Sequence, residues 1–167
     1  MKIELVIDGG LRIPVDYEML AMALRGLQIA EDNAVHLEAL ADHPAKEVRV
    51  ELAGKTNLSQ AAFRKLFATR DFAVIEALLS NSGNAGYFSK EMLAGLISQS
   101  EFAHIVARGL GDFPNADDSI GEALAAHPDP YVRNAFAGNF DAPKRLLRML
   151  SNDEDPAVAR SAKQTLE

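Results

Sequence analysis

The chain has 167 residues, of which 48% are hydrophobic and 25% are charged, and it has no cysteine. This composition is typical of a folded globular protein and excludes disulfides, thiolate metal sites and cysteine nucleophiles. The net charge of −7, from 17 basic and 24 acidic residues, disfavours nucleic acid as a partner unless the basic residues gather on one face.

The start of the chain, MKIELVIDGG, lacks the apolar core that a signal peptide has. No apolar run in the sequence is long enough to cross a bilayer. We therefore expect a cytoplasmic protein that does not bind a membrane.

Residues 1–15 are predicted to form a β-hairpin. The segments IELVI and LRIPV are joined by DGG, which is a hairpin turn signal. A two-stranded hairpin is only marginally stable alone in water, so it either lies on the helices or pairs with another chain. We prefer the first arrangement, because an alternating segment that contains Pro14 suits a ribbon covering one face.

Residues 16–39 are predicted to form a helical cap. Asp16 has the short acceptor that an N-cap needs and precedes a helix that runs to about Leu27. A second helix is predicted over about residues 33–42. Together these helices are typical of the end unit that closes a stack of repeats.

Residues 40–167 contain an internal repeat. When residues 40–81 are aligned with residues 124–165, 13 of the 42 positions are identical, including those that HPAKEVRVELAG shares with HPDPYVRNAFAG. Weaker copies are LFATRDFAVIEALL and LISQSEFAHIVARGL, in which DFA is matched with EFA, and LSNDEDPAVARSA. The leucines that begin the five copies are 26, 30, 28 and 26 residues apart: Leu40, Leu66, Leu96, Leu124 and Leu150. This period indicates a solenoid, in which no unit buries its apolar face alone.

Each unit is predicted to contain two short helices. In residues 45–54, Val48 and Leu52 share one face at helical spacing. Gly54 and Gly138 follow the helix end, where we expect a left-handed conformation that glycine adopts cheaply. Two later helices are predicted to begin with an aspartate N-cap and a first-turn proline: Asp129-Pro130 and Asp155-Pro156.

The segments HPxxxVRxxxAG and DEDPAVARSA resemble HEAT-like repeats, and especially the leucine-rich-repeat variant, whose units have the form LAxDPxxxVRxxLAxN. The resemblance covers residues 40–167. It implies an all-α fold, a right-handed α-solenoid of about five units, which with the hairpin and the cap makes a single domain over residues 1–167. Of the family's Asp and Arg positions, the aspartate is present only as Asp153 and the arginine only as Arg49 and Arg133. These departures count against a continuous Asp–Arg ladder between the units.

The sequence contains no P-loop, GxGxxG, HExxH or GxSxG motif. His43 and His127 occupy one repeat position before a proline, where we expect a polar residue flanking a helix start rather than a general base. His36 and His104 have no second ligand at helical spacing, which disfavours a zinc site. We therefore predict no enzyme activity, no cofactor and no metal ion.

The connections after the repeated helix differ in length. They are short at GKTN and GNFD but longer at SNSGNAGYF (80–88) and LGDFPNADD (110–118). Insertions at one repeat position lie on one edge of a stack, and repeat proteins bind partners at that edge or on the concave face. The aspartates of the second loop lack the glycine and glutamate of a calcium loop. Tyr87 and Phe113 either anchor an interface or pack on their own repeat, and the sequence favours neither.

The predicted partner-binding residues lie on these two loops and on exposed positions of the repeated helices. They are Tyr87, Asp112, Phe113, Asn115, Asp117, Asp118, Glu76, Tyr131 and Asn134. We expect a non-enzymatic scaffold that binds a protein or peptide at this edge, and the aspartates favour a basic partner.

The alternative is a nucleic-acid-binding protein, since some DNA-repair glycosylases use HEAT-like repeats. That function needs a basic concave face and aromatic residues that hold an extruded base. The chain has no tryptophan, three tyrosines and a negative net charge, and its densest basic cluster, KRLLR at 144–148, is typical of a solvated helix face. These features disfavour nucleic acid. A third possibility is that the chain is one part of a larger assembly, with the hairpin as its docking strand; the sequence does not indicate an oligomeric state.

Overall fold

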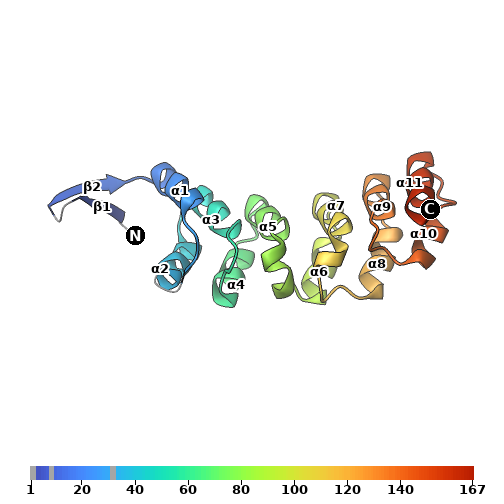
Figure 1. Ribbon diagram of the computed structural model, residues 1–167, viewed down its shortest axis with the longest axis horizontal. Coiled ribbons are helices and arrows are strands. Elements are labelled where there is room, and N and C mark those ends of the chain that lie inside the picture. The colour runs from blue at the N-terminus through green and yellow to red at the C-terminus, as the bar shows by residue number, and fades with distance from the viewer. Residues whose placement is uncertain (1–2, 8–9, 31–32) are drawn as a thin grey trace. The chain divides into compact units, whose positions relative to one another are not determined.

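The computed structural model describes residues 3–7, 10–30 and 33–167, and these residues are mostly helical (Figure 1). The chain divides into two compact units, Met1–Asn84 and Ala85–Glu167. The all-α class predicted from the sequence is confirmed, with one two-stranded sheet among the described residues. The single domain over residues 1–167 stays a prediction.

The first unit begins with the predicted hairpin. Strands β1 (Ile3–Ile7) and β2 (Leu11–Val15) pair antiparallel, while the predicted DGG turn includes residues 8–9, which lie outside the described residues. Every side chain of β2 is exposed or half-buried, and no helix packs along the hairpin in the described part of the chain. The structure therefore contradicts the preferred arrangement, in which the hairpin covers the helices.

The helices of the first unit form two rows. The elements are α1 (Tyr17–Gly26), α2 (Ala34–Ala39), the 3-10 turn η1 (Leu40–Asp42), α3 (Lys46–Ala53), α4 (Gln60–Ala68) and α5 (Phe72–Leu79), followed by the 3-10 segment η2 (Ser82–Tyr87). Helix α3 packs between α1 and α5, and α2 and α4 form the second row (Figure 1). As predicted, Asp16 is the N-cap of α1, where its Oδ1 accepts a hydrogen bond from the backbone N–H of Met19. Val48, Leu52 and Phe63 are fully buried between the rows.

The second unit has the same two-row arrangement. Its elements are α6 (Lys90–Leu96), α7 (Ser100–Arg108), the 3-10 turn η3 (Leu110–Asp112), α8 (Asp118–Ala125), α9 (Pro130–Ala137), α10 (Lys144–Leu150) and α11 (Pro156–Leu166). Helix α9 packs between α7 and α11, and α6, α8 and α10 form the other row (Figure 1). Phe88, Leu124 and Phe136 lie in its core. We call α1, α3, α5, α7, α9 and α11 the inner helices.

The buried positions of the inner helices correct the repeat alignment by two residues. Val74 of α5, Phe102 of α7 and Val132 of α9 are each buried near the start of their helix. The sequence alignment instead matched Phe102 with Phe72, whose ring is 46% exposed. The match was wrong because α5 begins after Asp71 and α7 begins after Gln99, so Phe72 is the first residue of its helix whereas Phe102 is the third.

The helix starts follow the prediction and the glycine stops do not. The side chains of Asp129 and Asp155 accept hydrogen bonds from the first backbone N–H groups of α9 and α11, and a proline follows each aspartate. Gly54 and Gly138, however, have φ angles of −76° and −85°. The left-handed conformation predicted for them is therefore wrong. The reason is that each helix ends in a tighter right-handed turn. The backbone N–H of the residue after the glycine closes this turn by donating a hydrogen bond to the carbonyl oxygen of Leu52 or Phe136.

An arginine near the start of α3 and of α9 makes the same two hydrogen bonds in each unit. Nη1 of Arg49 donates to the carbonyl oxygens of His43 and Pro44, and Nη1 of Arg133 donates to those of His127 and Pro128. The imidazole Nδ1 of each histidine accepts a hydrogen bond from the backbone N–H two residues later. The repeated His-Pro-x-x-x-Val-Arg segment is thus a helix-start structure in which the histidine is an acceptor.

Candidate functional site

Of the residues predicted for the loop site, Phe113 belongs to the folded core. Phe113 is only 4% exposed, and its ring packs edge-on against the buried ring of Phe88, with centroids 5.7 Å apart. Phe113 is therefore buried against Phe88, at the end of the preceding lengthened loop, and is not available to a partner, which corrects its assignment as a binding residue. Tyr87 is half-buried.

The polar residues of the 110–118 loop are also engaged within the second unit. Nδ2 of Asn115 donates to the carbonyl oxygens of Gly86 and Phe88, at 3.2 and 2.8 Å, and so joins the two lengthened loops. Asp117 is the N-cap of α8 and forms an ion pair with Lys90. Hydrogen bonds from Lys90 and from Ser119 lower the pKa of Asp117 to about 2. These contacts give both residues a structural role.

The remaining acidic residues of the predicted site are exposed. Asp112 and Glu76 are exposed, and Asp118 is exposed but pairs with Arg145 at 3.0 Å. A cavity of about 280 Å³ lies beside the loop and is lined by Phe113, Asp117, Asp118 and Asp141, among others. Because Lys90 and Arg145 offset the charges of two of these three aspartates, the cavity is a weaker site for a basic ligand than the sequence indicated.

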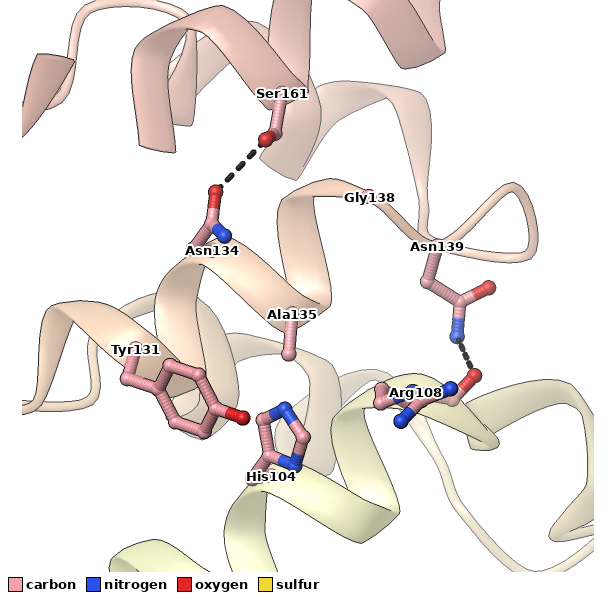
Figure 2. A pocket seen from close by; sticks show the side chains of 8 residues that line it. All are labelled: His104, Arg108, Tyr131, Asn134, Ala135, Gly138, Asn139 and Ser161. Carbon is pink, nitrogen blue, oxygen red and sulfur yellow. Dashed lines mark hydrogen bonds between the residues drawn. The ribbon is translucent and has the colours of Figure 1, made fainter. Parts of the chain in front are cut away.

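A larger cavity lies on the inner helices of the second unit, and two of the predicted residues line it. Its volume is about 390 Å³, which falls in the range of small-ligand and side-chain sites. The lining residues come from α7, α9 and α11 and the turn after α9 (Figure 2): His104, Arg108, Tyr131, Asn134, Ala135, Gly138, Asn139 and Ser161. We call it the inner-helix pocket.

Two stacked rings form one wall of the inner-helix pocket. The ring of His104 on α7 and that of Tyr131 on α9 lie 4.2 Å apart with an interplanar angle of 12° (Figure 2). The Tyr131 side chain is 61% exposed. Partial burial and the neighbouring Arg108 lower the pKa of His104 below its ordinary value of 6.5, against an opposing effect of Asp129. At neutral pH the imidazole is therefore uncharged, and the stack offers a neutral aromatic surface.

Hydrogen bonds position the polar residues of the opposite wall. The hydroxyl of Ser161 on α11 donates to Oδ1 of Asn134 at 2.7 Å (Figure 2). Asn139 is buried, and its Nδ2 donates to the carbonyl oxygens of Ala107 and Arg108, at the end of α7. Asn139 therefore has a structural role, whereas the guanidinium of Arg108 is exposed at the rim of the pocket.

The sequence identified Tyr131 and Asn134 but missed His104, Arg108 and Ser161. His104 was read as a lone helical histidine, because its partner Tyr131 is 27 residues further along the chain. The corrected repeat alignment gives the missing signal, since His104 and Asn134 occupy the same position of successive inner helices, two residues after the buried Phe102 and Val132.

Among the described residues, no group of three or more His, Cys, Asp or Glu side chains is placed to hold a metal ion. No helix in the described ranges has the length and apolar character that crossing a bilayer requires. The pocket residues themselves offer hydrogen-bond donors and aromatic faces.

The comparisons with known proteins gave no relative. No family model, no curated protein sequence and no solved structure matches the chain.

Proposed function

We propose that the chain is a non-enzymatic binding module, a right-handed α-solenoid of HEAT-like units whose inner-helix pocket holds part of a protein or peptide partner. The observation that carries the proposal is the stack of His104 on the exposed ring of Tyr131, beside the polar wall of a cavity of about 390 Å³. Aromatic side chains that line a partly polar pocket are typical anchors of protein interfaces. The cytoplasmic location expected from the sequence is part of this proposal.

The matching arginine networks of α3 and α9 support the repeat architecture. The bonds from Arg49 and Arg133 to the carbonyl groups before their helices are the same, as expected for copies of one structural unit. In such repeats the inner helices form the binding surface, and this is where the pocket lies.

The test is a comparison of two aromatic-to-alanine variants. Tyr131→Ala removes the exposed ring of the pocket, whereas Phe140→Ala removes a ring that is 85% exposed in the turn after α9 and does not line the pocket. Partners retained from cells of the native host are quantified for wild type and both variants, and melting curves check the fold. We expect Phe140→Ala to retain the partners of the wild type and Tyr131→Ala to lose them.

A second experiment with the same variant tests the nucleic-acid alternative. A gel shift on duplex DNA at moderate salt is run with the wild-type chain and with Tyr131→Ala, because phosphate-driven binding weakens steeply as salt rises. Micromolar binding to DNA, together with no partner that depends on Tyr131, would overturn the proposal in favour of the alternative.

A further inference from the structure

The inner-helix pocket has an unusual charge for this protein. The chain carries 24 acidic residues against 17 basic ones, yet none of the eight residues that line the pocket is acidic and one, Arg108, is a permanent cation. The inner helices of the first unit differ, since α3 and α5 expose Glu47 and Glu76, and α3 also carries Glu51, paired with Arg25.

Two polar side chains of the pocket, Asn134 and Arg108, present hydrogen-bond donors. The Ser161 hydroxyl occupies Oδ1 of Asn134, which leaves the amide N–H groups of that residue facing away from Ser161 (Figure 2). No acceptor among the described residues takes a hydrogen bond from Nδ2 of Asn134 or from the guanidinium of Arg108. The amide NH₂ of Asn134 and the guanidinium of Arg108 carry hydrogen-bond donors and no acceptor. The pocket is therefore complementary to a ligand that supplies acceptor oxygens.

From this arrangement we infer that the inner-helix pocket recognises an acidic peptide segment. A carboxylate of the peptide accepts hydrogen bonds from Arg108 and Asn134, and the adjoining part of the peptide packs on the face of Tyr131. A planar carboxylate matches the fork of a guanidinium, and the volume of about 390 Å³ admits a side chain. The inference rests on the proposed function and adds the chemical class of the partner.

The surroundings favour a short acidic peptide over a nucleic acid. Nucleic-acid affinity grows with the number of phosphates that basic residues neutralise, and Arg108 is the only cation that lines the pocket. The basic cluster at 144–148 lies on α10, in the other row of helices, and its Arg145 is paired with Asp118 and Glu122. Glu101 is exposed on α7, less than one turn before His104, and a continuous polyanion passing over the pocket would meet its charge.

The test is selection of a phage-displayed library of random linear peptides on the wild-type chain, followed by binding measurements with the enriched peptides. The pocket variants are Arg108→Glu and the milder Arg108→Gln. The control is Arg148→Glu, which makes the same charge change at an exposed side chain of α10 that has no side-chain partner among the described residues. We expect acidic peptides to be enriched and their affinity to fall about tenfold with Arg108→Glu and less than about twofold with Arg148→Glu.

Each other outcome overturns the inference in a distinguishable way. Enrichment of neutral or basic peptides, or acidic peptides that bind both charge-reversed variants equally, would refute acidic recognition and leave the binding module in place. No enrichment of any peptide would refute both. A single-stranded oligonucleotide that binds as tightly as the selected peptides, and loses affinity with Arg108→Glu, would assign the pocket to nucleic acid. If Arg108→Glu lowers the melting temperature, Arg108→Gln gives the same comparison without a reversed charge.

Discussion

Arg133 and Arg49 occupy the same repeat position but have different acidic partners. Nε and Nη2 of Arg133 donate to the two carboxylate oxygens of Asp153, both at 2.9 Å. Arg49 instead has Asp71 at 3.8 Å, and its buried Nε has no hydrogen-bond partner among the described residues. The difference arises from one residue, since Thr69 stands at the repeat position of Asp153. Thr69 keeps the other role of that position, because its hydroxyl accepts a hydrogen bond from the backbone N–H of Asp71.

The first prediction is that Thr69→Asp stabilises the protein. An aspartate at this position would accept the hydrogen bond that Arg49 Nε now lacks and would keep the turn to the following helix. We expect a gain of about 1 kcal/mol in the free energy of unfolding, measured by urea denaturation. Thr56→Asp, in the short connection after α3, is the control for an added negative charge. A gain from both variants alike, or from neither, would show that the unpaired Nε is not the cause.

The second prediction concerns Asp153→Thr. This substitution removes the carboxylate partner of Arg133, so that Arg133 resembles Arg49, which has Thr69 at the same repeat position. The pair is nearly buried, with side-chain exposures of 10% for Arg133 and 8% for Asp153. Leaving Arg133 without this partner should lower the free energy of unfolding by about 3 kcal/mol at neutral pH.

The effect of Asp153→Thr should depend on pH in a defined direction. The hydrogen bonds from Arg133 lower the pKa of Asp153 in the folded protein below its ordinary value of 3.8. A carboxyl group whose pKa falls on folding stabilises the folded state above the unfolded pKa and loses this contribution as the pH drops through the folded pKa. The stability difference between wild type and variant should therefore be constant down to about pH 5 and shrink below about pH 4. A difference that does not change with pH would mean that the carboxylate charge is not involved.

At the scale of elements, a side chain after an inner helix repeatedly binds the end of the inner helix before it. Nζ of Lys55 donates to the carbonyl oxygen of Arg25 at the end of α1, and Nδ2 of Asn84 donates to that of Ala53 at the end of α3. In the second unit Asn139 binds the end of α7 in the same way. The last carbonyl groups of a helix have no partner within it, so these side chains satisfy them and fix the spacing between neighbouring helices.

The third prediction tests this role with Asn139→Ala. The substitution leaves the carbonyl oxygens of Ala107 and Arg108 without their donor in a buried setting, and it also removes the acceptor of the Asp141 backbone N–H. We expect a loss of about 2 kcal/mol in the free energy of unfolding. Asn152→Ala, at an exposed position with only long hydrogen bonds to Arg148 O and Ser151 Oγ, should change it by less than about 0.5 kcal/mol. Equal effects would mean that Asn139 does not tie the helices.

Local signals in the sequence predicted the elements well and the connections poorly. The aspartate caps and the helix over residues 46–53 depend on residues that are close in the chain, and such interactions can be derived from spacing alone. The lengthened loops look polar and insertable, but Phe113 is buried against Phe88, 25 residues earlier in the chain. That contact depends on how α6 and α8 pack, which no local pattern encodes.

At the scale of the whole molecule, the limit was the register between repeats. The match of DFA with EFA was chosen by residue identity. The buried positions of the structure show instead that Phe102 is equivalent to Val74 rather than to Phe72. The wrong register matched His104 with the buried Val132 instead of Asn134, and the stack with Tyr131 could not be predicted. Repeats with variable connections conserve the pattern of burial, which identity captures only where the spacing is constant.

The hairpin is the remaining whole-molecule question, and deleting residues 1–15 answers it. Met22 and Val35, on α1 and α2, are 70% and 77% exposed, so the hairpin does not cover them, and the deletion leaves the Asp16 cap of α1 in place. The fourth prediction is that the deletion shifts the melting temperature by less than about 2 °C, because residues that bury little surface contribute little to stability. Light scattering is run alongside. A markedly lower melting temperature at unchanged mass would restore the capping arrangement, whereas a fall from dimer to monomer would show that the strands pair with a second chain, as an otherwise marginal two-stranded sheet requires.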